Sequence, residues 1–227
     1  MENLSVRLKT IAESVPANAK VCDVGTDHGF LPIYLASSGR AVSVIATDIN
    51  EKPLKKAEEN IKKSGVCGIS LRLCDGLSGV DKGEVDTVIA AGMGGEVISG
   101  ILFRGGEIVK NGDVALILQP TTSPEFLRKY LCENGFSILK EIPVEENGKL
   151  YSVMSCRFTD EKQSKPNWFY FSGLVDPKDR VGKKYLLKQR NRAEKCMKAL
   201  EKIESKQKEY NYYKEIFDNL WHLTADF

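Results

Sequence analysis

The stretch Val21–Pro32, with the sequence VCDVGTDHGFLP, limits what this chain can fold into more than any other segment. A short apolar run containing β-branched valines leads into Gly25, and an apolar segment begins at Phe30, directly after Gly29. This order predicts a strand, a glycine turn and a helix. Glycine has no Cβ, so such a turn lets the backbone pass close to a bound nucleotide.

The spacing of residues in the turn indicates which kind of nucleotide cofactor it would bind. It is D-x-G-x-x-x-G, because Asp27 stands where a dinucleotide-binding G-x-G-x-x-G turn has its middle glycine. A carboxylate there would repel the pyrophosphate of a nicotinamide cofactor. A cofactor without phosphates that carries an amino acid and a positive charge, such as S-adenosylmethionine, fits better. A purely structural glycine turn is the alternative.

Composition narrows the class of protein. The 227 residues allow one well-buried α/β domain and an appendage, and 28% charged residues with a net charge of +2 are typical of a soluble globular protein. No apolar run approaches the roughly 20 residues that a membrane span needs, and the N-terminus lacks the apolar core of a signal peptide. Six cysteines without a C-x-x-C pair indicate free thiols in a reducing cytoplasm. With two histidines, no zinc site is expected.

Strand-like and helix-like segments alternate through the first 159 residues. We predict strands over residues 20–24, 41–47, 69–73, 86–90 and 113–118, then a hairpin of 136–142 with 150–158. Alternation implies a mostly parallel, Rossmann-like sheet, to which the hairpin adds an antiparallel edge strand. Ligands of such sheets bind beyond the carboxyl ends of the strands. The residues expected on that rim are Gly25–His28, Asp48, Asp75, Gly76, Gly92–Gly95, Gln119 and Pro120.

Each rim motif permits a functional and a structural interpretation. Asp48 ends the second strand, where a carboxylate accepts hydrogen bonds from ribose hydroxyls, or it caps the next helix. Asp75 is placed to accept from an adenine amino group, although Asp-Gly is also an ordinary turn pair. The glycine-rich run from Gly92 leaves room for a flat acceptor, or is a flexible loop. Asp27 and His28 form either a reactive pair or a pair that satisfies loop amides.

Residues 160–227 differ from the rest, with 15 basic against 11 acidic residues. Leu186, Ala193 and Leu200 repeat every seven residues, which predicts two antiparallel helices packed as a small coiled coil that turns near 205–208. The chain is therefore divided into domains 1–159 and 160–227. A coiled coil that closes on itself favours a monomer, whereas the aromatic stretch Trp168–Phe171 leaves a dimer open.

The runs DVGTDHGFLP, TDIN, CDG, AAGMGGE and ILQP, with the N-terminal LSVRLKTIA and the helical tail, resemble the bacterial TrmK family. These are class I methyltransferases that use S-adenosylmethionine to methylate N1 of the adenine at position 22 of tRNA. The resemblance spans residues 4–158 motif by motif and is only architectural beyond them. It implies cofactor contacts from Gly25, Asp48, Asp75 and Gly92, and we predict further cofactor contacts from their neighbours Asp23, Thr26, Ile49 and Gly76. It also implies target-base contacts from Asp27 and the loop Met93–Gly95. The predicted catalytic residues are Asp27, His28, Met93 and Gly94.

The chemistry of this reaction agrees with those roles. Neutral adenine N1 already has a lone pair, so methyl transfer needs alignment more than proton abstraction. The product base is cationic, and a carboxylate such as Asp27 would stabilise the developing charge. His28 is interpreted as a positioning donor.

A base paired or stacked in folded RNA must be extruded, so tRNA binding would rely on backbone contacts. The basic candidates for those contacts are Arg7, Lys183, Lys184, Lys188, Arg190 and Arg192, and the alternative is a solvated helix face. Two further functions stay open. One is a methyltransferase for a small molecule or a protein, and the other is a non-catalytic module that binds S-adenosylmethionine.

Overall fold

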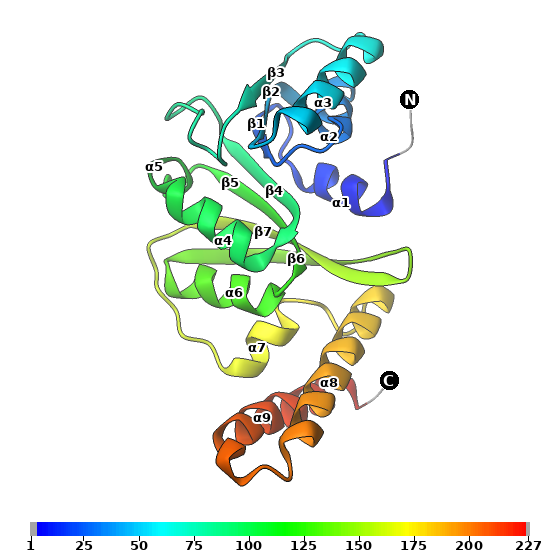
Figure 1. Ribbon diagram of the computed structural model, residues 1–227, viewed down its shortest axis with the longest axis vertical. Coiled ribbons are helices and arrows are strands. Elements are labelled where there is room, and N and C mark those ends of the chain that lie inside the picture. Colours follow the sequence, from blue (N-terminus) through cyan, green and yellow to red (C-terminus); the bar gives the residue numbers. More distant parts are fainter. Residues whose placement is uncertain (1–3, 226–227) are drawn as a thin grey trace.

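The computed structural model describes residues 4–225 and contains one seven-stranded sheet with helices on both faces (Figure 1). The strand order is β3-β2-β1-β4-β5-β7-β6. All neighbouring pairs from β3 to β5 are parallel, as the alternation of segments predicts. The strands are β1 (Ala19–Val24), β2 (Ala41–Asp48), β3 (Ile69–Leu73), β4 (Thr87–Gly94), β5 (Ala115–Thr122), β6 (Phe136–Glu146) and β7 (Lys149–Phe158).

The helices that cover this sheet produce a separate apolar core on each face. One core joins α4 and α6 to the sheet, with Ile98 and Leu127 fully buried, and the other joins α1 and α2, with Ile11 and Leu35 fully buried. Central strands covered on both faces are apolar along most of their length, because neither face meets water. The helices are α1 (Val6–Ser14), α2 (Phe30–Ser37), α3 (Glu51–Ser64), α4 (Gly95–Arg104), α5 (Gly106–Val109) and α6 (Pro124–Glu133).

Two details of the sheet differ from the sequence prediction. The hairpin does lie at one edge, but its antiparallel strand β7 pairs with β5 and leaves β6 outermost. The second strand of the hairpin, β7, thus occupies the position beside β5. In addition, β4 does not end at Ala90, because Met93 and Gly94 pair with Pro120 and Thr122 of β5. The predicted glycine loop is therefore an irregular extension of a strand.

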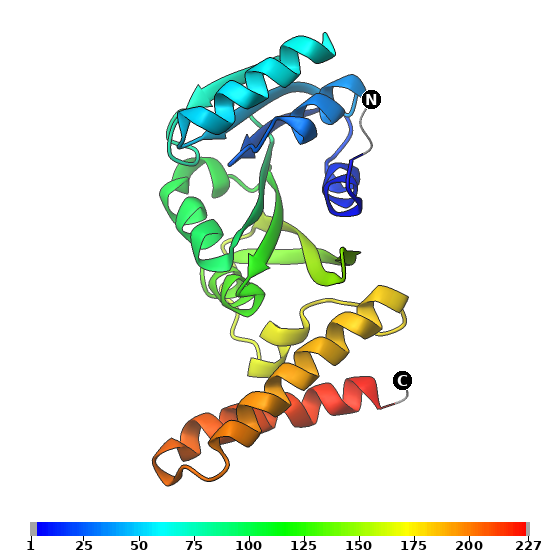
Figure 2. The same cartoon turned by 45° about the vertical axis from the view of Figure 1, so that its right-hand side comes forward.

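The C-terminal region forms a helical hairpin attached to the sheet domain (Figure 2). It consists of α7 (Asn167–Ser172), α8 (Arg180–Leu200), the short 3-10 helix η1 (Glu204–Lys206) and α9 (Gln207–Thr224). Leu186 and Ala193 of the predicted stripe are buried against Ile216 and Leu220, so the seam of the hairpin is apolar. The chain turns over residues 201–206, slightly earlier than predicted. The proposed domain boundary at 159 lies between β7 and α7 and stays a prediction.

A buried arginine joins the two regions. Arg128 of α6 is fully buried and forms an ion pair with Glu141 of β6 over 2.8 Å. Its guanidinium also donates to the carbonyl oxygen of Tyr170 at 2.7 Å and to the Tyr185 hydroxyl at 2.9 Å. Burial alone lowers the pKa of Arg128, but the neighbouring charge of Glu141 raises it overall, so the side chain stays charged. This cluster fixes α7 and α8 against the sheet.

Within residues 4–225, no helix combines the length and the apolar character needed to cross a membrane.

Candidate functional site

The glycine turn after β1 lies beside the ends of β2 and β4. Gly25 has a left-handed φ of 74°, which favours glycine, and its amide donates to the carbonyl oxygen of Thr47 at 2.8 Å. A Cβ at Gly25 would lie 3.4 Å from the Sδ of Met93. Absence of a side chain at Gly25 thus lets the Met93 thioether pack against the turn. Two predicted site motifs meet here.

Beneath the turn, Asp23 is 6% exposed and accepts a hydrogen bond from the Thr26 hydroxyl at 2.5 Å. Burial raises the pKa of Asp23 to about 6, an effect that the hydrogen bond from Thr26 partly offsets. At neutral pH this carboxylate is ionised at a cost in stability. A cationic ligand at the rim would be attracted to it.

The pKa of Asp23 predicts a pH dependence of stability. Below about pH 4, Asp23 is protonated in both folded and unfolded chains, and its contribution to stability is greatest there. Between about pH 4 and 6 the folded chain holds the proton longer, so this contribution is lost as the pH rises. We expect Asp23→Asn to gain up to about 3 kcal/mol relative to the wild type between these limits, measured by urea unfolding at several pH values. A difference that does not vary with pH would contradict this assignment.

Asp27 and His28 form the pair that the sequence suggests. The His28 Nε2 lies 3.2 Å from the Asp27 Oδ1, and the Asp27 side chain is 78% exposed. His28 has a left-handed φ of 63°, its ring stacks on Phe30, and its carbonyl oxygen accepts from the Asn60 amide at 2.8 Å. The imidazole is therefore positioned by its surroundings, while the carboxylate faces solvent above the turn.

The strand-end acids Asp48 and Asp75 lie next to each other, since the Cys74 amide donates to the Asp48 carbonyl oxygen at 3.0 Å. The Asp48 Oδ1 accepts from the Asn50 amide at 2.7 Å. Asn50 is the N-cap of α3, so Asp48 orders the loop before the helix instead of capping it. The Asp75 carboxylate accepts from the Arg104 guanidinium at 3.0 Å, a partner that the sequence does not suggest.

The other predicted cofactor residues share this edge. The Thr26 amide donates to the Thr47 carbonyl oxygen at 3.0 Å, and the Thr47 hydroxyl donates to the Gly76 carbonyl oxygen at 3.0 Å. Ile49 is 65% exposed beside Asp48. An exposed apolar side chain beside this strand-end carboxylate offers a surface on which a flat ring can pack.

Arg7 supports the end of β4 from below. Its guanidinium donates to the side-chain oxygen of Gln119 at 2.7 Å and to Glu146 at 3.2 Å. The same Gln119 oxygen accepts from the Gly92 amide at 3.2 Å. Arg7 therefore holds the end of β4 in place, and its guanidinium is engaged by Gln119 and Glu146. Its role as an RNA contact stays a prediction. Gln119 is fully buried, and a glutamine ending an apolar strand is the sequence signal that marks it.

The cations predicted on the tail have intramolecular partners. Lys184 pairs with Glu145 over 2.5 Å and Arg192 with Glu125 over 2.6 Å, both across to the sheet domain. Arg190 lies over the Trp221 ring and donates to the Thr224 hydroxyl at 2.9 Å. Lys188 is exposed, and its Nζ donates to the Leu150 carbonyl oxygen at 3.5 Å. Lys183 is half-buried on the same helix. Lys188 is thus better placed than Lys184 or Arg192 to meet a phosphate.

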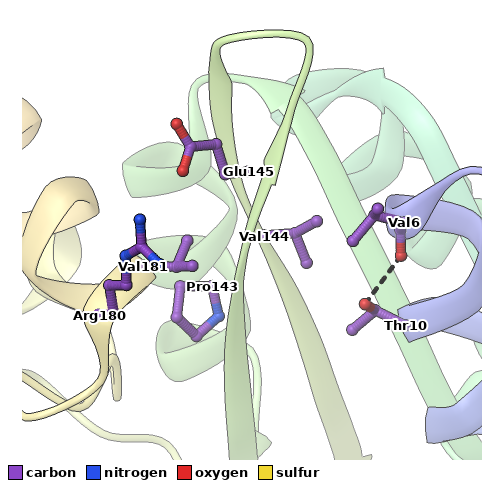
Figure 3. A pocket seen from close by; sticks show the side chains of 7 residues that line it. All are labelled: Val6, Thr10, Pro143, Val144, Glu145, Arg180 and Val181. Carbon is purple, nitrogen blue, oxygen red and sulfur yellow. Dashed lines mark hydrogen bonds between the residues drawn. The ribbon is translucent and has the colours of Figure 1, made fainter.

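A hollow of about 380 Å³ separates α1 from the start of α8 (Figure 3). Val144 and Pro143 of β6 form its floor, and Glu145 and Arg180 stand at its edge. The helical region thus faces the same side of the sheet domain as α1, which carries Arg7.

The strand order, the glycine turn after β1 and the acidic residues on the carboxyl rim define a class I methyltransferase. Comparison with known proteins agrees. Residues 4–154 match the family described as methyltransferase domain. The tRNA (adenine(22)-N(1))-methyltransferase of Bacillus subtilis is 39% identical over 152 residues, which are 66% of this chain and 63%, just under two thirds, of that protein.

Solved structures extend the similarity to the whole chain. The crystal structure of the B. subtilis m1A22 tRNA methyltransferase TrmK is 29% identical, with a TM-score of 0.86 over 99% of this chain and 100% of that one. Streptococcus pneumoniae Sp1610, solved in complex with S-adenosyl-L-methionine, is 31% identical, with a TM-score of 0.77 over 95% and 100% of the chains. This chain belongs to the TrmK family of methyltransferases.

Proposed function

We propose that this protein transfers a methyl group from S-adenosylmethionine to N1 of the adenine at position 22 of tRNA. The similarity to the B. subtilis enzyme along the full chain, tail included, is the observation that carries the proposal. Methyltransferases for small molecules or proteins share the cofactor half, but nothing in them requires this helical hairpin.

The residues of the rim suit S-adenosylmethionine. Asp23, Asp27, Asp48 and Asp75 place four carboxylates around the turn, where a cation is favoured and a phosphate is not. Asp48 would bind the ribose, and Asp75 and Ile49 would contact the adenine. The rest of the cofactor site would be lined by the backbone of Gly25, Thr26, Gly76 and Gly92. The cofactor supplies an electrophilic methyl group. Asp75 must then exchange its contact with Arg104 for one with adenine.

The chain's own contribution to the chemistry is alignment and charge. Met93 and Gly94 lie on the extended end of β4, where the Thr121 hydroxyl donates to the Met93 carbonyl oxygen at 3.0 Å. A target adenine held against this strand would face Asp27 across the turn. The Asp27 carboxylate would stabilise the positive charge that develops on the base, and His28 would orient that carboxylate.

Incubation with unmodified tRNA and methyl-labelled S-adenosylmethionine, followed by nucleoside analysis, tests the proposal. We expect N1-methyladenosine only in tRNAs that have adenine at position 22, with a transcript carrying guanosine there as the control. Label found at another base, or on protein, would overturn it.

Arg7→Met tests the role of Arg7 as a positioning residue. Without the hydrogen bond from Arg7, the Gln119 side chain that accepts from the Gly92 backbone N–H is less firmly fixed. We therefore expect turnover to fall about tenfold. The dependence of tRNA affinity on salt should stay that of the wild type, since the guanidinium is engaged with Glu146. A shallower salt dependence would return Arg7 to the RNA contacts.

We further propose that the protein acts as a cytoplasmic monomer. Tyr170 and Phe171 of the aromatic stretch are buried within the chain, and Trp168 packs on the same core. Few of these rings are therefore left to form a dimer interface. A dimeric mass in light scattering would contradict this.

A further inference from the structure

A second hollow, of about 470 Å³, lies between the end of β5, the hairpin strand β7 and the helix α8. Its lining includes Thr121 and Ser123 at the end of β5, Tyr151 of β7, and Lys188 and Gln189 of α8. Unlike the rim, it is built from both regions of the chain. Apart from the predicted RNA contacts of Lys188 and Arg192, none of the roles assigned above uses it.

Gln189 gives this hollow a chemical preference. The side chain is 5% exposed, and its Oε1 is the one buried side-chain oxygen or nitrogen among residues 4–225 without a hydrogen-bond partner. Buried polar atoms are nearly always paired, so an unpaired one calls for an explanation. Gln189 lines the hollow, and the terminal torsion of glutamine is broad, so its amide has rotational freedom there. What is missing there is a hydrogen-bond donor.

The hollow lies close to the end of β4, the strand against which the target adenine is proposed to be held. Its wall residue Thr121 donates to the Met93 carbonyl oxygen at 3.0 Å, and Thr122 pairs with Gly94. A target base on β4 and a group in the hollow would thus lie on either side of the end of β5. Lys188 also lines the hollow and is exposed, and the one hydrogen bond of its Nζ among residues 4–225 is 3.5 Å long, so its charge is available to a phosphate.

We propose that this hollow binds the base of the nucleotide next to the target adenine, in an extension of the proposed function on which this inference rests. Its exocyclic amino group donates to the Gln189 Oε1, and Lys188 contacts the adjoining phosphate. Extruding one nucleotide unstacks its neighbour, which then needs a place of its own. Adenine, guanine and cytosine carry such an amino group, whereas uracil does not.

Three variants of α8 test this. Gln189→Leu removes the acceptor, Lys188→Ala removes the charge, and Lys195→Ala is the matched control, an exposed lysine two turns further along that lies outside the hollow. Each is measured for affinity to tRNA, methyl transfer, affinity to S-adenosylmethionine and thermal stability. Transcripts with inosine for guanosine, or purine riboside for adenosine, at the nucleotides flanking the target remove the amino group alone, and uridine for cytidine replaces it with a carbonyl oxygen.

We expect Gln189→Leu and Lys188→Ala to weaken tRNA binding about tenfold, with the cofactor affinity and the control unchanged. The wild type should bind one of the transcripts that lack the amino group about tenfold more weakly than the unmodified transcript. Gln189→Leu should bind these two transcripts equally. A merely structural glutamine, or one satisfied by an ordered water, predicts no such discrimination.

If the wild type methylates tRNA but does not distinguish any deaminated transcript, this inference is wrong and the proposed function stands. If the wild type neither binds nor methylates tRNA, both are wrong.

Discussion

Replacing Asp27 with asparagine is expected to lower the turnover of methyl transfer about 100-fold while changing the affinity for S-adenosylmethionine less than about threefold. The Asp27 side chain is 78% exposed above the turn, so it supports none of the fold. Asparagine keeps the shape and can still bond to His28, but it lacks the negative charge. Three other carboxylates at the turn remain to attract the cationic cofactor, whereas Asp27 is the one proposed to face the base as it becomes cationic, so the loss should appear mainly in kcat.

Two variants sharpen this test. Asp48→Asn should weaken cofactor affinity with less effect on turnover at saturation, because Asp48 is assigned to the ribose. His28→Asn should cost less than Asp27→Asn, since the imidazole only orients the carboxylate. Equal losses of turnover and cofactor affinity in Asp27→Asn would instead assign Asp27 to the cofactor.

Most of the sheet could be predicted because its strands are short apolar runs bounded by turn residues. The predicted limits of β3, Ile69–Leu73, are those observed. The end of β4 could not be predicted in this way, because a glycine-rich run has little preference for a strand. It is extended by its pairing with β5, where Met93 lies opposite Pro120. Tertiary pairing decided what local sequence could not.

The candidate site likewise contains features that the sequence predicts and features that depend on contacts between distant residues. Asp27, Asp48 and Asp75 could be placed on one rim because topology alone brings strand ends together. The support of Gly92 by Arg7 could not, since Arg7 reaches Gln119 from 112 residues away in the sequence. For a similar reason the ion pairs of the basic tail could not be predicted, and its contact with RNA stays a prediction. Its acidic partners Glu125 and Glu145 come from the sheet domain.

The largest expected effect on stability follows from the ion pair of Arg128 with Glu141. Both side chains have no exposed surface, and the pair lies 2.8 Å apart. Arg128→Met should reduce the free energy of unfolding by about 3–5 kcal/mol, because it leaves the Glu141 carboxylate buried without its partner. The carbonyl oxygens of Tyr170 and Phe171 would also lose their donor. Urea unfolding followed by circular dichroism measures this change.

The double variant Arg128→Met with Glu141→Leu separates the charge from the packing. Removing both ions ends the desolvation penalty, so most of the lost stability should return. The contact between regions should not return, because methionine cannot donate to the Tyr170 carbonyl oxygen or to the Tyr185 hydroxyl. Faster amide exchange in α7 and α8 of a stable double variant would therefore identify Arg128 as the residue that fixes the helical region to the sheet. If the double variant were as unstable as the single one, packing would account for the loss. Exchange as slow as in the wild type would show that the apolar contacts alone hold the two regions together.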